Sequence, residues 1–290
     1  MITCGLSIST EEIFQLIDVH KPYFALENLM QSEDGSVSAI IPIQQQLGYE
    51  PLPITNCEAG RHLAVLGSCA IALKKGSRDR HYYLAAKANT TRLNFENRNP
   101  SFMSATAKCL SVDSKSAITE LILSYIDGKV FSKSIIDYHI INHKTFERVY
   151  KSKVLPMLLT GDNPYIQEPY VEFQTISDTK LTATIDHISH IDCQGHFVNL
   201  PAVPISTLFG RSVALAIHLM QVRLNKPHGV FVVKEFTSDA RNLAFPGDVI
   251  DFEAQFVFTD EKHNHLVKLS AHTNADCCVG EAELILSEVG

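Results

Sequence analysis

The chain has 290 residues, of which 45% are hydrophobic and 20% are charged, so it can bury substantial cores in one large or two ordinary domains. Its formal net charge of −7 provides no general attraction to nucleic acid or to an anionic membrane. The N-terminal segment lacks the basic and long apolar regions of a secretory signal, and no run of about 18 residues is both apolar and free of charge. We therefore expect a cytoplasmic protein that binds neither nucleic acid nor a membrane.

The seven cysteines are odd in number and show no C-x-x-C spacing. Such a set is typical of reduced thiols in a reducing compartment rather than of a disulfide framework.

In chain order, the first half predicts a short capped helix, two extended segments, a long helix and then a run of antiparallel strands. The expected ranges are Glu11–Ile17, Phe24–Met30, Val37–Ile43, the helix Thr55–Lys75, and the strands His81–Asn94, Phe102–Val112, Ala117–Tyr125 and Lys129–Ile141. The dipeptide Asp127-Gly128 is a hairpin signal before the last of these strands.

The second half repeats this order after a link at residues 143–165 that we expect to be ordered. Its ranges are two extended stretches within Val171–Ile191, a loop over Gly195–Pro204, the helix Ser206–Lys226, and strands at Gly229–Thr237, Val249–Phe258, Leu266–Thr273 and Val279–Leu286.

The two long helices are copies of one pattern. Gly60-Arg61 and Gly210-Arg211 occupy corresponding places and are 210 − 60 = 150 positions apart. Apolar residues surround nearly the whole circumference of each helix, as expected of helices that are enclosed by other structure. The sequence therefore predicts an α+β protein with two similar halves, residues 1–150 and 151–290, in which an antiparallel sheet wraps around each central helix.

Three passages resemble the hot-dog fold, and within it the 3-hydroxyacyl-acyl-carrier-protein dehydratases of fatty-acid synthesis. Gly195-His196-Phe197, with Pro201 and Pro204, resembles the GHFPGxPxxPG loop of that family. Its first helix and strand are similar to residues 11–40, and its last strands to residues 246–258 and 279–288. The resemblance covers both halves, so it implies a tandem (double) hot-dog fold.

The resemblance also implies the site, because the family combines a loop histidine from one unit with a carboxylate on the central helix of the other. His196 and Glu58 match these two positions, whereas Tyr49 and Leu208 stand where the second pair would be. We therefore expect one composite catalytic site, His196 with Glu58, and one inactive site.

Dehydration of a 3-hydroxyacyl thioester needs a base for the proton beside the carbonyl and an acid for the departing hydroxyl, and a histidine beside a carboxylate supplies both. The resemblance implies that substrate contacts come from the loop and from the start of the central helix, and it requires no cofactor and no metal. The expected substrate-binding residues are Phe197, Val198, Asn199, Gly60, Arg61 and Tyr49. Val198-Asn199 replaces the Pro-Gly of the family, so the loop need not present the same N–H groups.

Several alternatives stay open. Thr55 and Glu58 have the spacing of a capping box, in which the carboxylate serves only the helix start. His187, His190, Cys193 and His196 are three residues apart, but the strand-like alternation before them argues against a shared zinc ion.

The expected function is a dehydratase that acts on acyl-carrier-protein or CoA thioesters. A hot-dog acyl thioesterase is the alternative, and a non-catalytic acyl-binding or scaffold protein is the second alternative. The halves form an internal pseudo-dimer, with further homo-oligomerisation possible.

Overall fold

The structure, a computed structural model, describes residues 5–45, 50–51, 53–96, 98–153, 161–167, 172–273 and 277–289. Its helices are α1 (Thr10–Ile17), α2 (Asn56–Lys75), α3 (His143–Val149) and α4 (Ile205–Arg223), with short 3₁₀ turns at Lys151–Lys153, Pro164–Ile166 and Ile191–Cys193. Its strands are β1 (Leu6–Ser7), β2 (Glu27–Gln31), β3 (Val37–Pro42), β4 (His81–Arg92), β5 (Phe102–Val112), β6 (Ser116–Ser124), β7 (Val130–Asn142), β8 (Phe173–Ser177), β9 (Lys180–Ile185), β10 (Phe231–Ala240), β11 (Ile250–Thr259), β12 (Asn264–Thr273) and β13 (Cys278–Glu288).

The two central helices begin in different ways. At the start of α2, the Thr55 hydroxyl accepts a hydrogen bond from the N–H of Glu58, and the helix ends at Gly76 in the left-handed conformation. In contrast, α4 begins after Pro204, which has no side-chain group to cap the helix. The first turn of α4 therefore lacks a side-chain acceptor for its backbone N–H groups.

The thirteen strands in the described part of the chain form one antiparallel sheet, in the order β1-β2-β3-β5-β6-β7-β4-β10-β13-β12-β11-β9-β8. The halves meet at its centre, where β4 pairs with β10 from Lys87–Asp239 to Thr91–Glu235. The antiparallel strands of each half are thus joined edge to edge with those of the other half.

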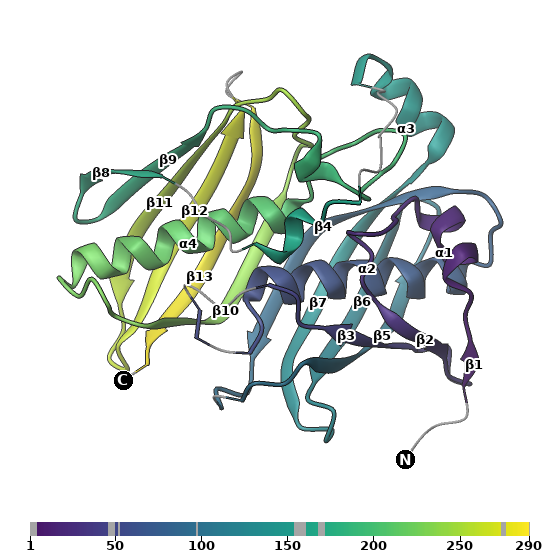
Figure 1. Ribbon diagram of the computed structural model, residues 1–290, viewed down its shortest axis with the longest axis horizontal. Coiled ribbons are helices and arrows are strands. Elements are labelled where there is room, and N and C mark those ends of the chain that lie inside the picture. Colours follow the sequence, from purple (N-terminus) through teal and green to yellow (C-terminus); the bar gives the residue numbers. More distant parts are fainter. Residues whose placement is uncertain are drawn as a thin grey trace.

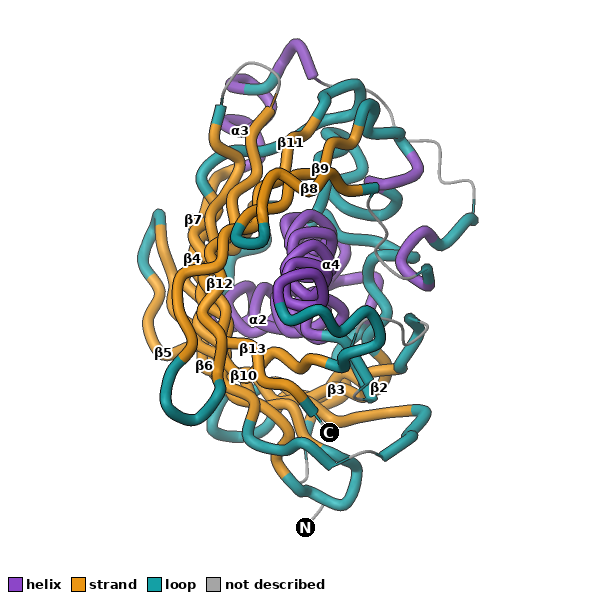
Figure 2. Tube along the Cα trace, turned by 90° about the vertical axis from the view of Figure 1, so that its left-hand side faces the viewer, coloured by secondary structure: helices purple, strands orange, loops and turns teal. Residues whose placement is uncertain are grey.

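Both central helices lie on the same concave face of this sheet and run outward from its middle (Figure 1). Seen from the side, the strands form a curved layer that encloses α2 and α4 (Figure 2). Helix α2 packs on β3, β5 and β6, and α4 packs on β9, β11 and β12. The tandem hot-dog fold is confirmed, and the boundary between the halves near residue 150 stays a prediction.

A loop of the second half is embedded in the first. The N–H of Phe197 donates to the carbonyl of Asp18, and Val19 forms a bridge with His196. Phe197 and Leu200 are buried within the hydrophobic core of the first half. The inserted loop therefore holds His196 against the first half, although His196 belongs to the second half in sequence.

Some elements were not expected from the sequence. Helix α3 forms because Asn142 caps it and because Phe146 is buried, with its ring stacked on Tyr82 at 4.0 Å between centroids. The six cysteines at described positions are all unpaired. Helix α4 is long and apolar enough to cross a membrane, but 61% of it is buried inside the protein, and a buried core helix passes the same test.

Candidate active site

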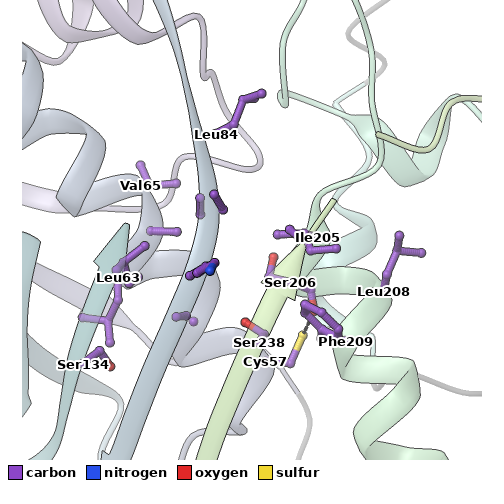
Figure 3. A pocket seen from close by; sticks show the side chains of 18 of the residues that line it. Cys57, Leu63, Val65, Leu84, Ser134, Ile205, Ser206, Leu208, Phe209 and Ser238 are labelled. Carbon is purple, nitrogen blue, oxygen red and sulfur yellow. Dashed lines mark hydrogen bonds between the residues drawn. The ribbon is translucent and has the colours of Figure 1, made fainter. Parts of the chain in front are cut away.

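A channel runs between the central helices and the strands at the seam of the halves. It is lined by α2, α4, β4, β7 and β10, and it holds a cavity of about 180 Å³, similar to an engineered cavity of about 150 Å³ that binds benzene. Along β4 its lining extends from Tyr83 to Arg92, which is 92 − 83 = 9 steps, or about 30 Å at a strand rise of ~3.3 Å per residue. Figure 3 shows Leu84 at one end, Ser134 toward the other, and Phe209 across from them. The channel is therefore long and narrow, with mostly apolar walls.

His196 lines the channel near the Leu84 end. The neighbouring Phe197 packs edge-on against Tyr82, with ring centroids 4.9 Å apart, which places the loop beside the first residues of β4. The Nδ1 of His196 lies 2.8 Å from the carbonyl oxygen of Ala202. Because a carbonyl only accepts, Nδ1 carries the proton, and Nε2 is left as the acceptor of a neutral imidazole.

Glu58 does not line the channel. It lies in a second hollow of about 550 Å³, with Arg61, Tyr165, Thr207 and Arg211. Its Oε1 accepts hydrogen bonds from the N–H groups at positions 44 and 45, at 2.7 and 3.1 Å, and its buried Oε2 has no hydrogen-bond partner in the described part of the chain. Only one hydrogen bond of the capping box forms, the one from the N–H of Glu58 to the Thr55 hydroxyl. The Glu58 carboxylate binds the turn at residues 44–45 instead of the N-cap N–H.

Three side chains separate the channel from the second hollow. Cys57 and Ser206, at the starts of α2 and α4, line both spaces. The Cys57 thiol donates to the carbonyl of Ser206, and the Tyr23 hydroxyl lies 3.2 Å from the Ser206 hydroxyl. Tyr23 also packs on His196 at 4.8 Å between ring centroids, and the Arg61 guanidinium lies 6.0 Å from the Tyr23 ring. Tyr23 thus stands between the two predicted catalytic regions.

Burial controls the ionisation of these groups. It lowers the pKa of His196 to about 4, although the bond to Ala202 opposes the shift. It also lowers the pKa of His62, whose Nε2 lies 3.1 Å from an Arg61 nitrogen, to about 4. Burial raises the pKa of Cys57 and of Tyr23 to about 12. At neutral pH both histidines are uncharged, and Cys57 is a thiol rather than a nucleophilic thiolate.

The structure divides the predicted substrate-binding residues. Gly60 and Phe197 line the channel, and Arg61 lines the second hollow. Val198 and Asn199 line neither space. The prediction for Tyr49 falls outside the described residues.

The two arginines of the repeated Gly-Arg pair bind carboxylates within their own halves. Arg61 lies 3.8 Å from Glu58, and Arg211 lies 3.4 Å from Asp192. Among the described residues, neither arginine forms an ion pair across the halves.

The opposite end of the channel contains polar groups that the sequence analysis missed. Arg92 and Ser132 face each other across β4 and β7, as do Thr90 and Ser134. All four line the channel. The sequence of β7 contained a signal for this polar end. The buried positions of the strand are apolar at Ile136 and Tyr138 but are serine at positions 132 and 134.

No family model and no curated protein sequence matches this chain. Solved structures do resemble it. The tesB protein of Mycobacterium avium subs paratuberculosis has a TM-score of 0.59 at 9% identity, covering 90% of this chain and 96% of its own. A 12:0-ACP thioesterase from Umbellularia californica has a TM-score of 0.58 at 11% identity, covering 93% and 100%. An acyl-ACP thioesterase from Bacteroides thetaiotaomicron has a TM-score of 0.56 at 14% identity, covering 88% and 99%. At such identities, the likeness establishes the tandem hot-dog fold.

These comparisons correct the expectation of a 3-hydroxyacyl thioester dehydratase. The structures from Umbellularia californica and Bacteroides thetaiotaomicron, which match nearly the whole chain, are named as thioesterases, so the dehydratase expectation is wrong. The geometry supplies a physical reason. Dehydration needs its acid and base at neighbouring atoms of one substrate, whereas His196 faces the channel and Glu58 faces the second hollow.

Proposed function

We propose that the protein is a thioesterase, which hydrolyses an acyl thioester of CoA or of an acyl carrier protein to a free acid and a thiol. The observation that supports this proposal best is the neutral His196 imidazole, held by Ala202 at one end of a narrow apolar channel. Such a channel suits a linear acyl chain, whose burial contributes about 0.8 kcal/mol for each CH₂ group. We also propose that the protein is cytoplasmic, because its cysteines are odd in number and show no C-x-x-C spacing.

In the proposed reaction, His196 is the general base. Its Nε2 takes a proton from water as the water oxygen attacks the thioester carbonyl, and a tetrahedral intermediate forms. When the C–S bond breaks, the imidazolium returns the proton to the departing thiolate. The first turn of α4, which has no side-chain cap, reaches the channel at Ser206. Pro204 accepts the N–H groups of Thr207 and Leu208, so the N–H groups of Ile205 and Ser206 and the helix dipole would stabilise the negative carbonyl oxygen.

Glu58 acts in this proposal as a positioning residue. Its Oε1 fixes the turn at residues 44–45, and its charge lies 3.8 Å from Arg61, next to Tyr23. Through Tyr23 this arrangement supports the wall against which the His196 ring packs. Replacement of Glu58 by Gln should therefore slow turnover less than replacement of His196.

The direct test uses acyl-CoA and acyl-carrier-protein thioesters of several chain lengths, with free thiol and free acid quantified by mass spectrometry. We expect release of both products, and a loss of ~10²- to 10⁴-fold in His196→Ala, the usual contribution of a general base. Ser68→Ala is the matched control, because Ser68 also lines the channel but its hydroxyl is already bonded to the carbonyl of Ala64. Tight acyl binding without product release, or equal release by His196→Ala, would refute the proposal.

A further inference from the structure

The end of the channel that lies opposite His196 contains an arginine with free bonding capacity. Arg92 is 5% exposed, and its Nη2 lies 3.3 Å from the buried carboxylate of Glu50. Its guanidinium also lies 4.9 Å from the ring of Phe131. The buried Nη1 has no hydrogen-bond partner in the part of the chain that the structure describes. A charged donor is thus left unbonded in a low-dielectric wall, which is costly unless something occupies the site.

A second donor without a partner among the described residues lies on the neighbouring strand, directly opposite Arg92. Ser132 pairs with Arg92 in the ladder between β4 and β7, and it is 3% exposed. Among described residues, its hydroxyl also lacks a partner. The adjacent rung is polar as well, since the hydroxyls of Thr90 and Ser134 lie 2.8 Å apart. These four residues form a polar end on a sheet face that elsewhere supports a hydrophobic core.

The charges at this polar end determine what it can bind. Glu50 already balances Arg92, and its other oxygen accepts the N–H of Asn56 at 2.6 Å. A second carboxylate would be buried beside Glu50 without a countercharge, which is unfavourable. The groups that remain are donors, the Nη1 of Arg92 and the hydroxyl of Ser132. They match an uncharged oxygen with lone pairs.

We propose that the substrate of this channel is an acyl thioester that carries a neutral oxygen group, a hydroxyl or a carbonyl, at the end of the chain distant from the thioester. The thioester lies at His196, and the oxygen lies between Arg92 and Ser132. This inference rests on the proposed function, because it uses the same channel and the same acyl orientation. Its specificity follows from the buried donors, since a site with unpaired polar groups discriminates against an analogue that leaves them unbonded.

Binding of non-hydrolysable probes tests this inference without any turnover. The probes are S-alkyl pantetheine thioethers, in pairs of equal chain length that end in either CH₂OH or CH₂CH₃ with the same number of heavy atoms. Dissociation constants are measured calorimetrically at the chain length that binds most tightly. Wild-type protein should bind the hydroxyl probe at least threefold more tightly than the methyl-terminated probe. The reason is that a hydrogen bond to a charged group contributes more binding free energy than is lost with the apolar contact of one methyl group.

Ser132→Ala is the test variant, since it removes one donor that has no hydrogen-bond partner among the described residues. It should reduce the ratio of the two dissociation constants at least threefold. Ser68→Ala is the control, because it removes a channel hydroxyl that is already bonded, and it should leave the ratio unchanged. Unfolding curves in urea would show that both variants fold.

The outcomes separate the two proposals. A methyl-terminated probe that binds wild-type protein as tightly as the hydroxyl probe, or a ratio that Ser132→Ala does not change, overturns the inference and leaves the polar end with ordered water only. Failure of every probe to bind overturns both the inference and the acyl channel. Hydrolysis of unsubstituted acyl thioesters without any preference for the hydroxyl would keep the thioesterase and remove the polar subsite.

Discussion

The open space beside Gly60 can be tested by adding a single methyl group. Gly60 lies inside α2, and a Cβ built there meets no atom within 4 Å, because the position faces the channel. Alanine is favoured over glycine in a helix interior by about 1 kcal/mol. Gly60→Ala should therefore raise the free energy of unfolding by ~0.5–1 kcal/mol, with no offsetting clash.

The same substitution two turns later should have the opposite sign. At Gly67 a Cβ would lie 3.0 Å from the Cζ of Tyr138 and 3.1 Å from the hydroxyl of Thr119. Tyr138 is fully buried, and its hydroxyl donates to the carbonyl of Ala64 at 2.9 Å. Overpacking of this kind costs ~1–3 kcal/mol, which exceeds the gain in helix propensity. Urea denaturation of the wild-type protein, Gly60→Ala and Gly67→Ala measures the three free energies of unfolding. A lower value for Gly60→Ala than for the wild type would mean that the channel is closed beside α2.

Three further predictions concern activity and pH. Tyr23→Phe, which removes only the hydroxyl next to Ser206, should reduce hydrolysis by less than ~10-fold, in contrast to His196→Ala, and equal losses in a kinetic assay would contradict the role of His196 as base. Ala64→Phe, at a position that lines the channel, should shorten the longest accepted acyl chain and preserve short-chain turnover; uniform loss across a chain-length series would indicate disrupted packing instead. The buried His62 has a pKa of about 4 in the folded protein against 6.5 ordinarily, so the unfolded chain binds more protons between pH 6.5 and 4. The free energy of unfolding should therefore fall as the pH drops through that window, by up to about 1.4 kcal/mol per pH unit for this residue. Urea titrations of His62→Gln should show a flatter dependence of this free energy on pH. An unchanged dependence would mean that another group binds the proton.

The architecture was predictable because local patterns and the global fold agree. The apolar circumference of the Thr55–Lys75 segment requires a helix enclosed on all sides, and α2 is that helix. Its repetition 150 residues later predicted a second helix and a second sheet. Helix α4 confirms the second helix, whereas β10 to β13 continue the sheet of the first half and do not form a separate one. The alternation of apolar and polar residues predicted most strands to within two residues of their observed bounds.

The site could be predicted only in part, because periodicity does not determine which face of a helix borders which hollow. Glu58 and Gly60 are two residues apart, so they point about 200° apart on α2, and only Gly60 faces the channel. Likewise, Tyr23 comes between His196 and Arg61 only because the second-half loop inserts beside α1, a contact between residues more than 170 positions apart. No local spacing carries that information.

The resemblance of the halves makes the difference between the two ends of the channel informative. The sequence has Gly48-Tyr49-Glu50 before the first central helix, where the second half has Gly195-His196-Phe197 before its own. His196 lines the channel as a neutral imidazole, whereas Glu50 lies behind the channel wall, bound to Arg92 and to the N–H of Asn56. Both oxygens of Glu50 are already engaged, one by Arg92 and the other by the N–H of Asn56, so this carboxylate does not face a substrate. If hydrolysis occurs at His196, the acyl chain must then extend toward Arg92, and the end that lacks a base becomes the part of the channel that selects the substrate.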